Sequence, residues 1–296
     1  MATGVQVGAA IFASRLAVAD LGPTALAMLR YGIGAMILLP IAAVMGTLRV
    51  RRHDLLPIAF LGIGQFGILI ALLNFALLHL SAARVALVFA TLPILTMLVA
   101  ASLGRETLSL RKTLGILVTL VGVAAALWDG LVEGGGAMPW LGVGATLASA
   151  LVGAVCSIFY GPYVRRYSPV KISALAMTFS VVFLLCLTPL DPPPGGLSGA
   201  AGAPWGAVLF VGASSGLGYV MWTFALKELP ATDVTIFMCL SPVTATALDA
   251  LILGRPPGPG LLVGLVAVAS GLYLALRSTD PLAPAVGSVL TPPKDR

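Results

Sequence analysis

Two ionisable side chains stand inside long apolar runs, where a charge is energetically costly. Arg30 interrupts the run TALAMLRYG, and Asp249 interrupts the run TATALDALILG. A buried guanidinium can bind a carboxylate, and a buried carboxyl group can relay protons. Each also has a structural interpretation, because Arg30 can anchor neighbouring helices and Asp249 can pair with Arg255 or Arg30. Both interpretations stay open from the sequence.

Polar and aromatic residues recur at helical spacing in other apolar runs. Trp222 follows Tyr219 by three residues, and Tyr163 follows Tyr160 by three, so each pair shares one helix face. Such rings can stack on apolar or cationic compounds. Asn74 can contact a substrate or hydrogen-bond a neighbouring helix. We predict a substrate-binding set of Arg30, Asn74, Tyr160, Tyr219 and Trp222.

Two prolines, Pro93 and Pro242, lie in the middle of apolar runs. A proline inside a helix frees a carbonyl group and kinks the helix. Such a kink can hinge a gate or can be static, and both alternatives remain. We assign gating or coupling roles to Pro93, Pro242 and Asp249.

Catalytic and metal-binding patterns are missing from the sequence. The two histidines, His53 and His79, fall near opposite ends of one apolar run, so they would lie on opposite membrane faces. The three cysteines all lie in apolar stretches and indicate no disulfide framework. We therefore predict no enzyme activity, no metal site and no cofactor.

The composition predicts an all-α integral membrane protein. Hydrophobic residues make up 59% of the 296 residues and charged residues 9%, whereas soluble domains carry about 25% charged residues. A membrane-spanning helix needs about 20 mostly apolar residues. Ten stretches fit: 3–19, 22–46, 55–78, 83–104, 109–128, 140–164, 170–190, 204–226, 232–254 and 259–277.

The basic residues predict the orientation of these spans. If the N-terminus lies inside, 13 of the 17 Lys and Arg residues fall in inside loops or the inside tail. Only Arg84 and Arg255 fall outside, and Arg15 and Arg30 lie within spans. Cytoplasmic loops collect Lys and Arg, so we expect both termini in the cytoplasm. This placement explains the net charge of +6 without nucleic acid as a partner.

The chain also repeats itself at an offset of 149 residues. ALAM at 25–28 aligns with ALAM at 174–177, and FALLHLSAARVALVFATLPIL at 75–95 aligns with FALKELPATDVTIFMCLSPVT at 224–244. Gly115 and Gly122 align with Gly264 and Gly271 at the same offset. An odd number of spans per half inverts the second half in the membrane. We therefore predict two inverted five-helix repeats, 1–128 and 140–277, followed by a disordered cytoplasmic tail, 278–296.

These halves resemble the EamA repeat of the drug/metabolite transporter superfamily. The resemblance rests on Arg15, on Pro23 and Arg30, on the Ala-Ala-Arg stretch 82–84, on Pro93, on Gly-Arg-Glu at 104–106, and on Gly115 and Gly122. The second half departs from the pattern, since Phe179 aligns with Arg30 and GRPPGPG at 254–260 lacks the glutamate. The resemblance implies ten helices, cytoplasmic termini and export of amino acids or other small metabolites.

Together these observations predict a secondary transporter that works by alternating access between two halves. A small-molecule substrate and the lipid bilayer are the expected partners, and proton coupling stays open as an alternative. The abundance of Ala, Gly and Arg indicates a bacterium with a GC-rich genome, hence the inner membrane. Two alternatives stay open: a membrane-embedded enzyme, which would need clustered His, Asp or Glu residues, and a non-transporting membrane scaffold.

Overall fold

In the computed structural model the described part of the chain consists of helices joined by turns and short loops. The described residues are 2–45, 50–105, 110–132, 139–191, 201–229, 231–236, 238 and 240–276. No strand occurs within these ranges. The tail 278–296, which we expected to be disordered, lies outside them.

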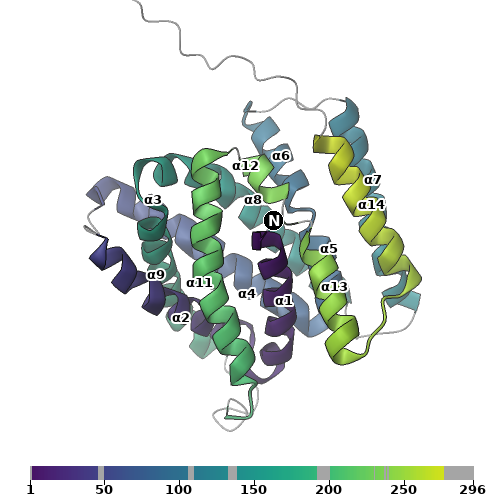
Figure 1. Cartoon of the computed structure of the whole chain (residues 1–296), viewed down its shortest axis with the longest axis horizontal. Helices are drawn as coiled ribbons and strands as arrows, with labels where there is room; N and C mark the ends of the chain where they lie inside the picture. Colours follow the sequence, from purple (N-terminus) through teal and green to yellow (C-terminus); the bar gives the residue numbers. More distant parts are fainter. Residues whose placement is uncertain are drawn as a thin grey trace, which may run out of the picture.

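The helices follow the predicted apolar stretches (Figure 1). The first half contains α1 (Ala2–Leu21), α2 (Pro23–Val44), α3 (Arg52–Gly62), the π-helix η1 (Ile63–Ile68), α4 (Leu69–His79), α5 (Ala82–Phe89), α6 (Leu92–Ser102) and α7 (Leu110–Val132). The second half contains α8 (Pro139–Arg166), α9 (Pro169–Leu187), the 3-10 helix η2 (Thr188–Leu190), α11 (Trp205–Glu228), α12 (Ala231–Ile236), α13 (Leu240–Leu253) and α14 (Pro259–Leu276).

Seven of the described helical segments are long and apolar enough to cross a membrane, which requires about 20 residues. They are Thr3–Leu21, Pro23–Val44, Arg52–His79, Ala82–Ser102, Pro139–Arg166, Pro169–Leu187 and Trp205–Glu228. Three shorter apolar helices are Thr113–Ala126, Leu240–Leu253 and Pro259–Gly271. The fold is thus that of a multi-pass membrane protein, whereas the number of ten spans stays a prediction.

Pro93 and Pro242 each stand just after a break between two helical segments. We expected residues 83–104 to form one span with a kink at Pro93. Ala82–Ser102 is indeed one apolar span, and it is interrupted next to Pro93, since α5 ends at Phe89, α6 starts at Leu92 and the two residues between them keep helical dihedral angles. Pro93 therefore stands in the first turn of α6, where its missing N–H would have no partner in any case. Its equivalent, Pro242, likewise stands in the first turn of α13.

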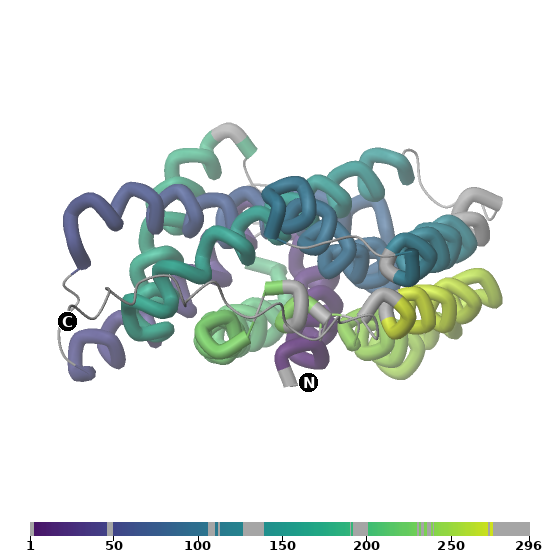
Figure 2. Tube along the Cα trace, turned by 90° about the horizontal axis from the view of Figure 1, so that it is seen from above, coloured from purple at the N-terminus to yellow at the C-terminus, as the bar shows by residue number. Residues whose placement is uncertain are grey.

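The helices pack in pairs that follow the repeat. At the 149-residue offset α2 corresponds to α9 and α7 to α14, and each of these pairs packs together. The contact of α1 with α11 has its counterpart in the contact of α8 with α4. The α7–α14 pair lies at one edge of the molecule, and α1 lies between α11 and α13 (Figures 1 and 2).

Glycines explain the close approach of α7 and α14. A Cβ atom at Gly122 would lie 2.6 Å from the Cβ of Ala267, and one at Gly271 would lie 2.6 Å from the carbonyl oxygen of Gly115. No side chain fits at such distances, so the backbones touch, as small residues allow between membrane helices. The glycines that first revealed the repeat therefore serve packing.

Candidate functional site

A cavity lies between the two halves at the centre of the helical bundle. Its volume is about 80 Å³, well below the roughly 300–1,000 Å³ of typical ligand pockets, so a substrate needs the helices to move apart. Its walls come from α1, α2, η1, α4, α5, α6, α11 and the segment between α12 and α13. The lining residues are Thr3, Gln6, Val7, Ile11, Arg30, Tyr31, Gln65, Leu69, Ile70, Leu73, Phe89, Leu92, Ser215, Gly218, Tyr219, Trp222 and Met238.

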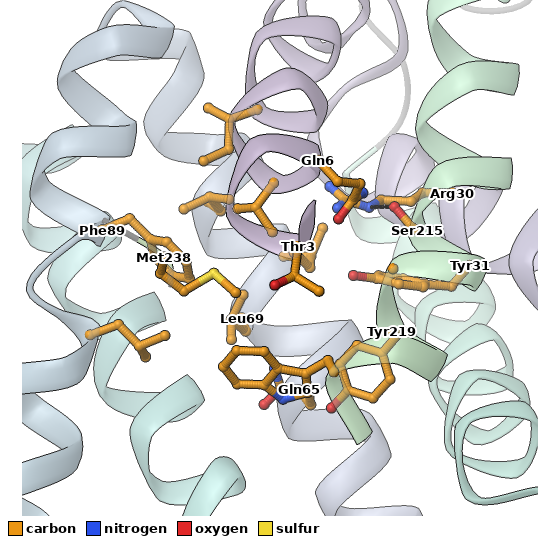
Figure 3. A pocket seen from close by; sticks show the side chains of 17 residues that line it. Thr3, Gln6, Arg30, Tyr31, Gln65, Leu69, Phe89, Ser215, Tyr219 and Met238 are labelled. Atoms are coloured by element: carbon orange, nitrogen blue, oxygen red, sulfur yellow. Dashed lines mark hydrogen bonds between the residues drawn. The ribbon is translucent and has the colours of Figure 1, made fainter. Parts of the chain in front are cut away.

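Arg30 supplies the charge of this cavity (Figure 3). It is only 6% exposed, and its Nε donates a hydrogen bond to the Oγ of Ser215 at 2.7 Å. Its Nη1 has no hydrogen-bond partner among the described residues. The guanidinium carbon lies 5.4 Å from the Tyr31 ring, so the aromatic face also supports the cation. Arg30 is thus held by one nitrogen and can bond an acceptor through another.

A pair of glycines sets the distance between Arg30 and Ser215. Gly34 lies one turn beyond Arg30 on α2, and Gly216 follows Ser215 on α11. A Cβ atom at Gly216 would lie 3.3 Å from the Cα of Gly34. Small residues let helix backbones approach this closely. The close crossing of α2 and α11 therefore brings the serine hydroxyl to the guanidinium.

Three more polar atoms of the lining residues lack partners within the described part of the chain. They are Gln65 Oε1, Tyr219 OH and Trp222 Nε1. Buried polar groups are normally hydrogen-bonded. Because one amide oxygen, one hydroxyl and one indole N–H meet Arg30 at a single cavity, the site can bond a molecule that carries both acceptors and donors.

The π-helix η1 carries Gln65 at this depth of the bundle. Such turns are rare, and they occur frequently at functional sites. The equivalent of Gln65 is Ser214 on α11, which is α-helical from Trp205 to Glu228. The two halves therefore shape their backbones differently at the cavity, although no residue is inserted between the aligned stretches.

Aromatic rings form one side of the site. The Phe66 ring lies 4.7 Å from that of Tyr31 and 4.2 Å from that of Tyr219, both in edge-to-face geometry. Tyr160 is fully buried, with its ring 6.4 Å from the Tyr219 ring, and it is not among the lining residues. Tyr160 therefore supports Tyr219 from behind in this conformation.

The structure brings Arg30, Tyr219 and Trp222 together and leaves Asn74 apart. Asn74 is fully buried outside the lining, and its amide nitrogen donates to the carbonyl oxygen of Pro23 at 3.0 Å. Its equivalent, Thr223, shares a 3.1 Å hydrogen bond with Ser173. Each of these bonds ties a helix to the start of its neighbour, which favours the helix–helix interpretation for Asn74.

The residues predicted to gate lie around the cavity without lining it. Phe89 ends α5, and its equivalent Met238 lies between α12 and α13, so both helix breaks face the cavity, on the side opposite Arg30 in Figure 3. Pro93 and Pro242 begin the helices that follow these breaks.

Asp249 lies outside the cavity lining and joins the two halves. Its Oδ2 accepts a hydrogen bond from the backbone N–H of Ala83 at 3.1 Å. It thereby satisfies a free N–H in the first turn of α5. Its described hydrogen-bond partner is thus a helix end. Of the two arginines that we considered, Arg255 acts on this carboxyl group through its charge, whereas Arg30 bonds Ser215.

Two further carboxylates clamp opposite ends of α9. Asp191 accepts a hydrogen bond from the Thr24 hydroxyl at 2.9 Å, which links the end of α9 to the start of α2. Asp54 accepts from Arg166 Nη1 at 2.9 Å and from the Tyr167 hydroxyl at 2.5 Å, which links α3 to the end of α8 and the turn that leads into α9. Within the described residues, no three His, Cys, Asp or Glu side chains could hold a metal ion.

Five polar lining residues lie outside the predicted substrate-binding set: Thr3, Gln6, Tyr31, Gln65 and Ser215. Gln6 donates to the Ser214 Oγ at 3.3 Å, and a Cβ atom at Gly218 would lie 2.8 Å from the Gln6 Cδ. Thr3 and Gln6 are three residues apart and polar within an apolar helix. That spacing was a usable signal for a polar face on α1.

The fold and the cavity define a class: a multi-pass membrane transport protein with an internal site between two halves. The sequence profile of the EamA-like transporter family matches residues 1–128 and 139–277. The chain belongs to this family, so it is a transporter with a small-molecule substrate, as the resemblance implied.

Curated relatives match the chain along most of its length. It is 28% identical to the "Probable terminal-alkyne amino-acid exporter" of Streptantibioticus cattleyicolor, over 94% of this chain and 92% of the relative. It is 25% identical to the uncharacterized transporter YyaM of Bacillus subtilis, over 92% and 90%. A crystal structure of another protein superposes with a TM-score of 0.66 at 23% identity, over 93% of this chain and 96% of that one, which shows the fold alone.

Proposed function

We propose that this transporter exports amino acids or closely related carboxylates across the bacterial inner membrane. The observation that carries the proposal is the buried Arg30, whose Nη1 is unbonded among the described residues while its Nε is held by Ser215. A guanidinium held in this way binds a carboxylate strongly. The amino-acid exporter among the relatives supports the same substrate class.

The remaining unpartnered atoms suit the rest of an amino acid. Trp222 Nε1 donates a second hydrogen bond to the carboxylate, and Gln65 Oε1 accepts one from the ammonium group. The Tyr219 ring offers its face to the same cation. Leu69, Ile70 and the other apolar lining residues take an apolar side chain.

The mechanism is alternating access between two inverted five-helix halves that together make ten spans, with both termini in the cytoplasm. The helix pairing, in which the α2–α9 and α7–α14 contacts map onto themselves and the α1–α11 contact maps onto the α8–α4 contact, supports this symmetry. Motion of one half against the other widens the narrow cavity and exposes it to one side at a time.

Asp249 has the gating role in this mechanism. Its hydrogen bond to Ala83 crosses the two halves at the proposed outer end and must break when that end opens. A carboxyl group that exchanges a backbone partner for a proton also provides a route for proton coupling.

The test is flux in proteoliposomes that contain the purified transporter. L-propargylglycine, a terminal-alkyne amino acid, is the probe, and propargylglycinamide is its control without a carboxylate. We expect flux of the acid that a pH gradient alters, little flux of the amide, and loss of acid flux in Arg30→Ala. The matched control is Arg52→Ala, which removes an exposed arginine outside the site.

The same measurement separates the competing classes. If a folded protein moved neither this acid nor any member of a broad panel of carboxylates, the transport site would be wrongly assigned. An enzyme would consume the compound without moving it, and a scaffold would do neither.

A further inference from the structure

A second, larger pocket lies near the end of the bundle where the basic loops gather. Its volume is about 500 Å³, and its walls come from the ends of α6, α8 and α11 and from the start of α12. Arg105, Arg165 and Ser157 are its polar lining residues, and the others are small or apolar. None of its described lining residues is acidic, so Arg105 and Arg165 are the charged groups of the described lining.

The two arginines present their charges at the rim. Both side chains are exposed, and the guanidinium carbon of Arg105 lies 5.6 Å from the Phe159 ring, which supports the cation from one side. The Ser157 hydroxyl already donates to the carbonyl oxygen of Gly153 at 2.7 Å. The guanidinium groups are therefore the strongest donors that the pocket offers to an anion.

Two elements lead from this pocket to the central cavity. Leu226 lines the pocket and Trp222 lines the cavity, four residues apart on one face of α11, about 6 Å along the helix. Ala231 lines the pocket at the start of α12, and Met238 lines the cavity seven residues later. Along α11, Trp222 is thus the cavity-lining residue nearest to the second pocket.

We infer that this pocket is a vestibule in which Arg105 and Arg165 bind the carboxylate of the substrate before it passes Trp222 and reaches Arg30. The inference rests on the proposed function and adds a second anion site on the proposed cytoplasmic side. Charged clefts raise the local concentration of oppositely charged ligands, and salt weakens this attraction. The vestibule then selects against cations before they reach the cavity.

Gly161 permits a test that needs no transport. A Cβ atom at this lining position would have no neighbour within 4 Å, so a cysteine there fits without rearrangement. Gly161→Cys is made in a background in which Cys156, Cys186 and Cys239 are alanine. The labelling rates of anionic and cationic methanethiosulfonate reagents are compared, each relative to its rate with a free thiol. We expect the anionic reagent to react about tenfold faster.

The double variant Arg105→Gln/Arg165→Gln should remove most of that preference. Its matched control, Arg52→Gln/Arg111→Gln, removes two exposed charges outside the pocket and should retain it. If the first double variant left the anion preference unchanged, the arginines would not set the potential of the vestibule and the proposal would be wrong. This result is independent of whether L-propargylglycine is transported.

Flux then distinguishes a substrate carboxylate from a lipid phosphate. In liposomes of zwitterionic lipid alone, we expect Arg105→Gln/Arg165→Gln to raise KM for L-propargylglycine about five- to tenfold when the acid is added at the vestibule side. The maximal rate should stay within about twofold, and the KM effect should shrink at high salt. An unchanged KM there, with an effect only after anionic lipid is added, would reassign the site to a lipid headgroup and overturn the proposal.

Discussion

A residue pair that joins the two halves, and the equivalent pair at the 149-residue offset, show how the halves have diverged at the cavity. In one, Arg30 on α2 bonds Ser215 on α11 across a gap of 2.7 Å. At the 149-residue offset, the equivalents of these two residues are Phe179 and Phe66. The polar pair of Arg30 and Ser215 thus corresponds to a pair of aromatic residues in the repeat.

The ties between neighbouring helices have not diverged in the same way. Asn74 bonds the start of α2, and its equivalent Thr223 bonds the start of α9. This hydrogen bond between neighbouring helices is therefore kept in both halves, whereas the groups at the cavity are not. A symmetric frame allows both halves to move alike, and a one-sided charge binds a carboxylate in a single orientation.

Moving the charge to the other half should cause the largest effect. The double variant Arg30→Phe/Phe179→Arg keeps the composition but separates the guanidinium from Ser215. We expect kcat/KM for L-propargylglycine to fall about 100-fold, equivalent to about 3 kcal/mol, because the equivalent of Ser215 is a phenylalanine. Wild-type flux from the swapped variant, with a normal size-exclusion profile, would show that the position of the charge does not matter.

Trp222 is a second hydrogen-bond donor of the cavity without a counterpart in the other half, since its equivalent is Leu73. Trp222→Phe keeps the ring and removes the N–H, so we expect KM to rise about tenfold through loss of one hydrogen bond to a charged group. Trp140→Phe is the control, because Trp140 is 63% exposed and outside the cavity. Equal KM values for the two variants would remove Trp222 from the substrate contacts.

Gly216, where α11 crosses α2, and its equivalent Gly67, where η1 meets α9, allow the two helix crossings to be compared. An alanine Cβ at 216 meets the Gly34 backbone at 3.3 Å, whereas one at 67 meets the Phe183 ring at 3.0 Å. A ring can rotate away and a backbone cannot. We therefore expect Gly216→Ala to lower kcat/KM about fivefold by lengthening the Arg30–Ser215 contact, and Gly67→Ala to lower it less. The reverse order in a flux assay would contradict the role of the α2–α11 crossing.

Substitutions at Asp249 test the hydrogen bond that links the two halves, and we expect them to have the smallest effect on flux. Asp249→Asn retains an oxygen that can accept from Ala83, whereas Asp249→Ala loses the cap and about 1 kcal/mol of stability. We expect thermal unfolding to separate Ala from Asn. If Asp249 also couples protons, the Asn variant will transport without response to a pH gradient. An unaltered response would restrict Asp249 to its bond with α5.

Much of the architecture was predictable because membrane burial imposes a strong pattern on a sequence. The apolar stretches match the helices within a few residues, and the family match bears out the resemblance drawn from Arg15, Pro93 and the paired glycines. The sequence predicted an interruption at Pro93 and Pro242 but not its form, since a proline is compatible both with a kink inside a helix and with the first turn of a new helix.

The candidate site was predictable only in part. Arg30, Tyr219 and Trp222 stand out because polar and aromatic groups are unusual in apolar runs, and these three line the cavity. Asn74 and Asp249 stand out equally, yet they bond backbone groups of neighbouring helices. Residue type alone does not distinguish a group that awaits a substrate from one that is already bonded.

The sequence by itself determined the class of the fold, the twofold repeat and the family, because hydropathy, basic-residue placement and a constant offset are properties of the chain order. Only the tertiary structure decided which polar groups meet. The approach of α2 to α11 at Gly34 and Gly216, the π-turn that carries Gln65, and the bond from Asp249 to Ala83 each depend on backbones more than 100 residues apart in the chain or on a local change in helix geometry. Hydrogen bonds act over about 3 Å, so the site exists only once packing has set those distances.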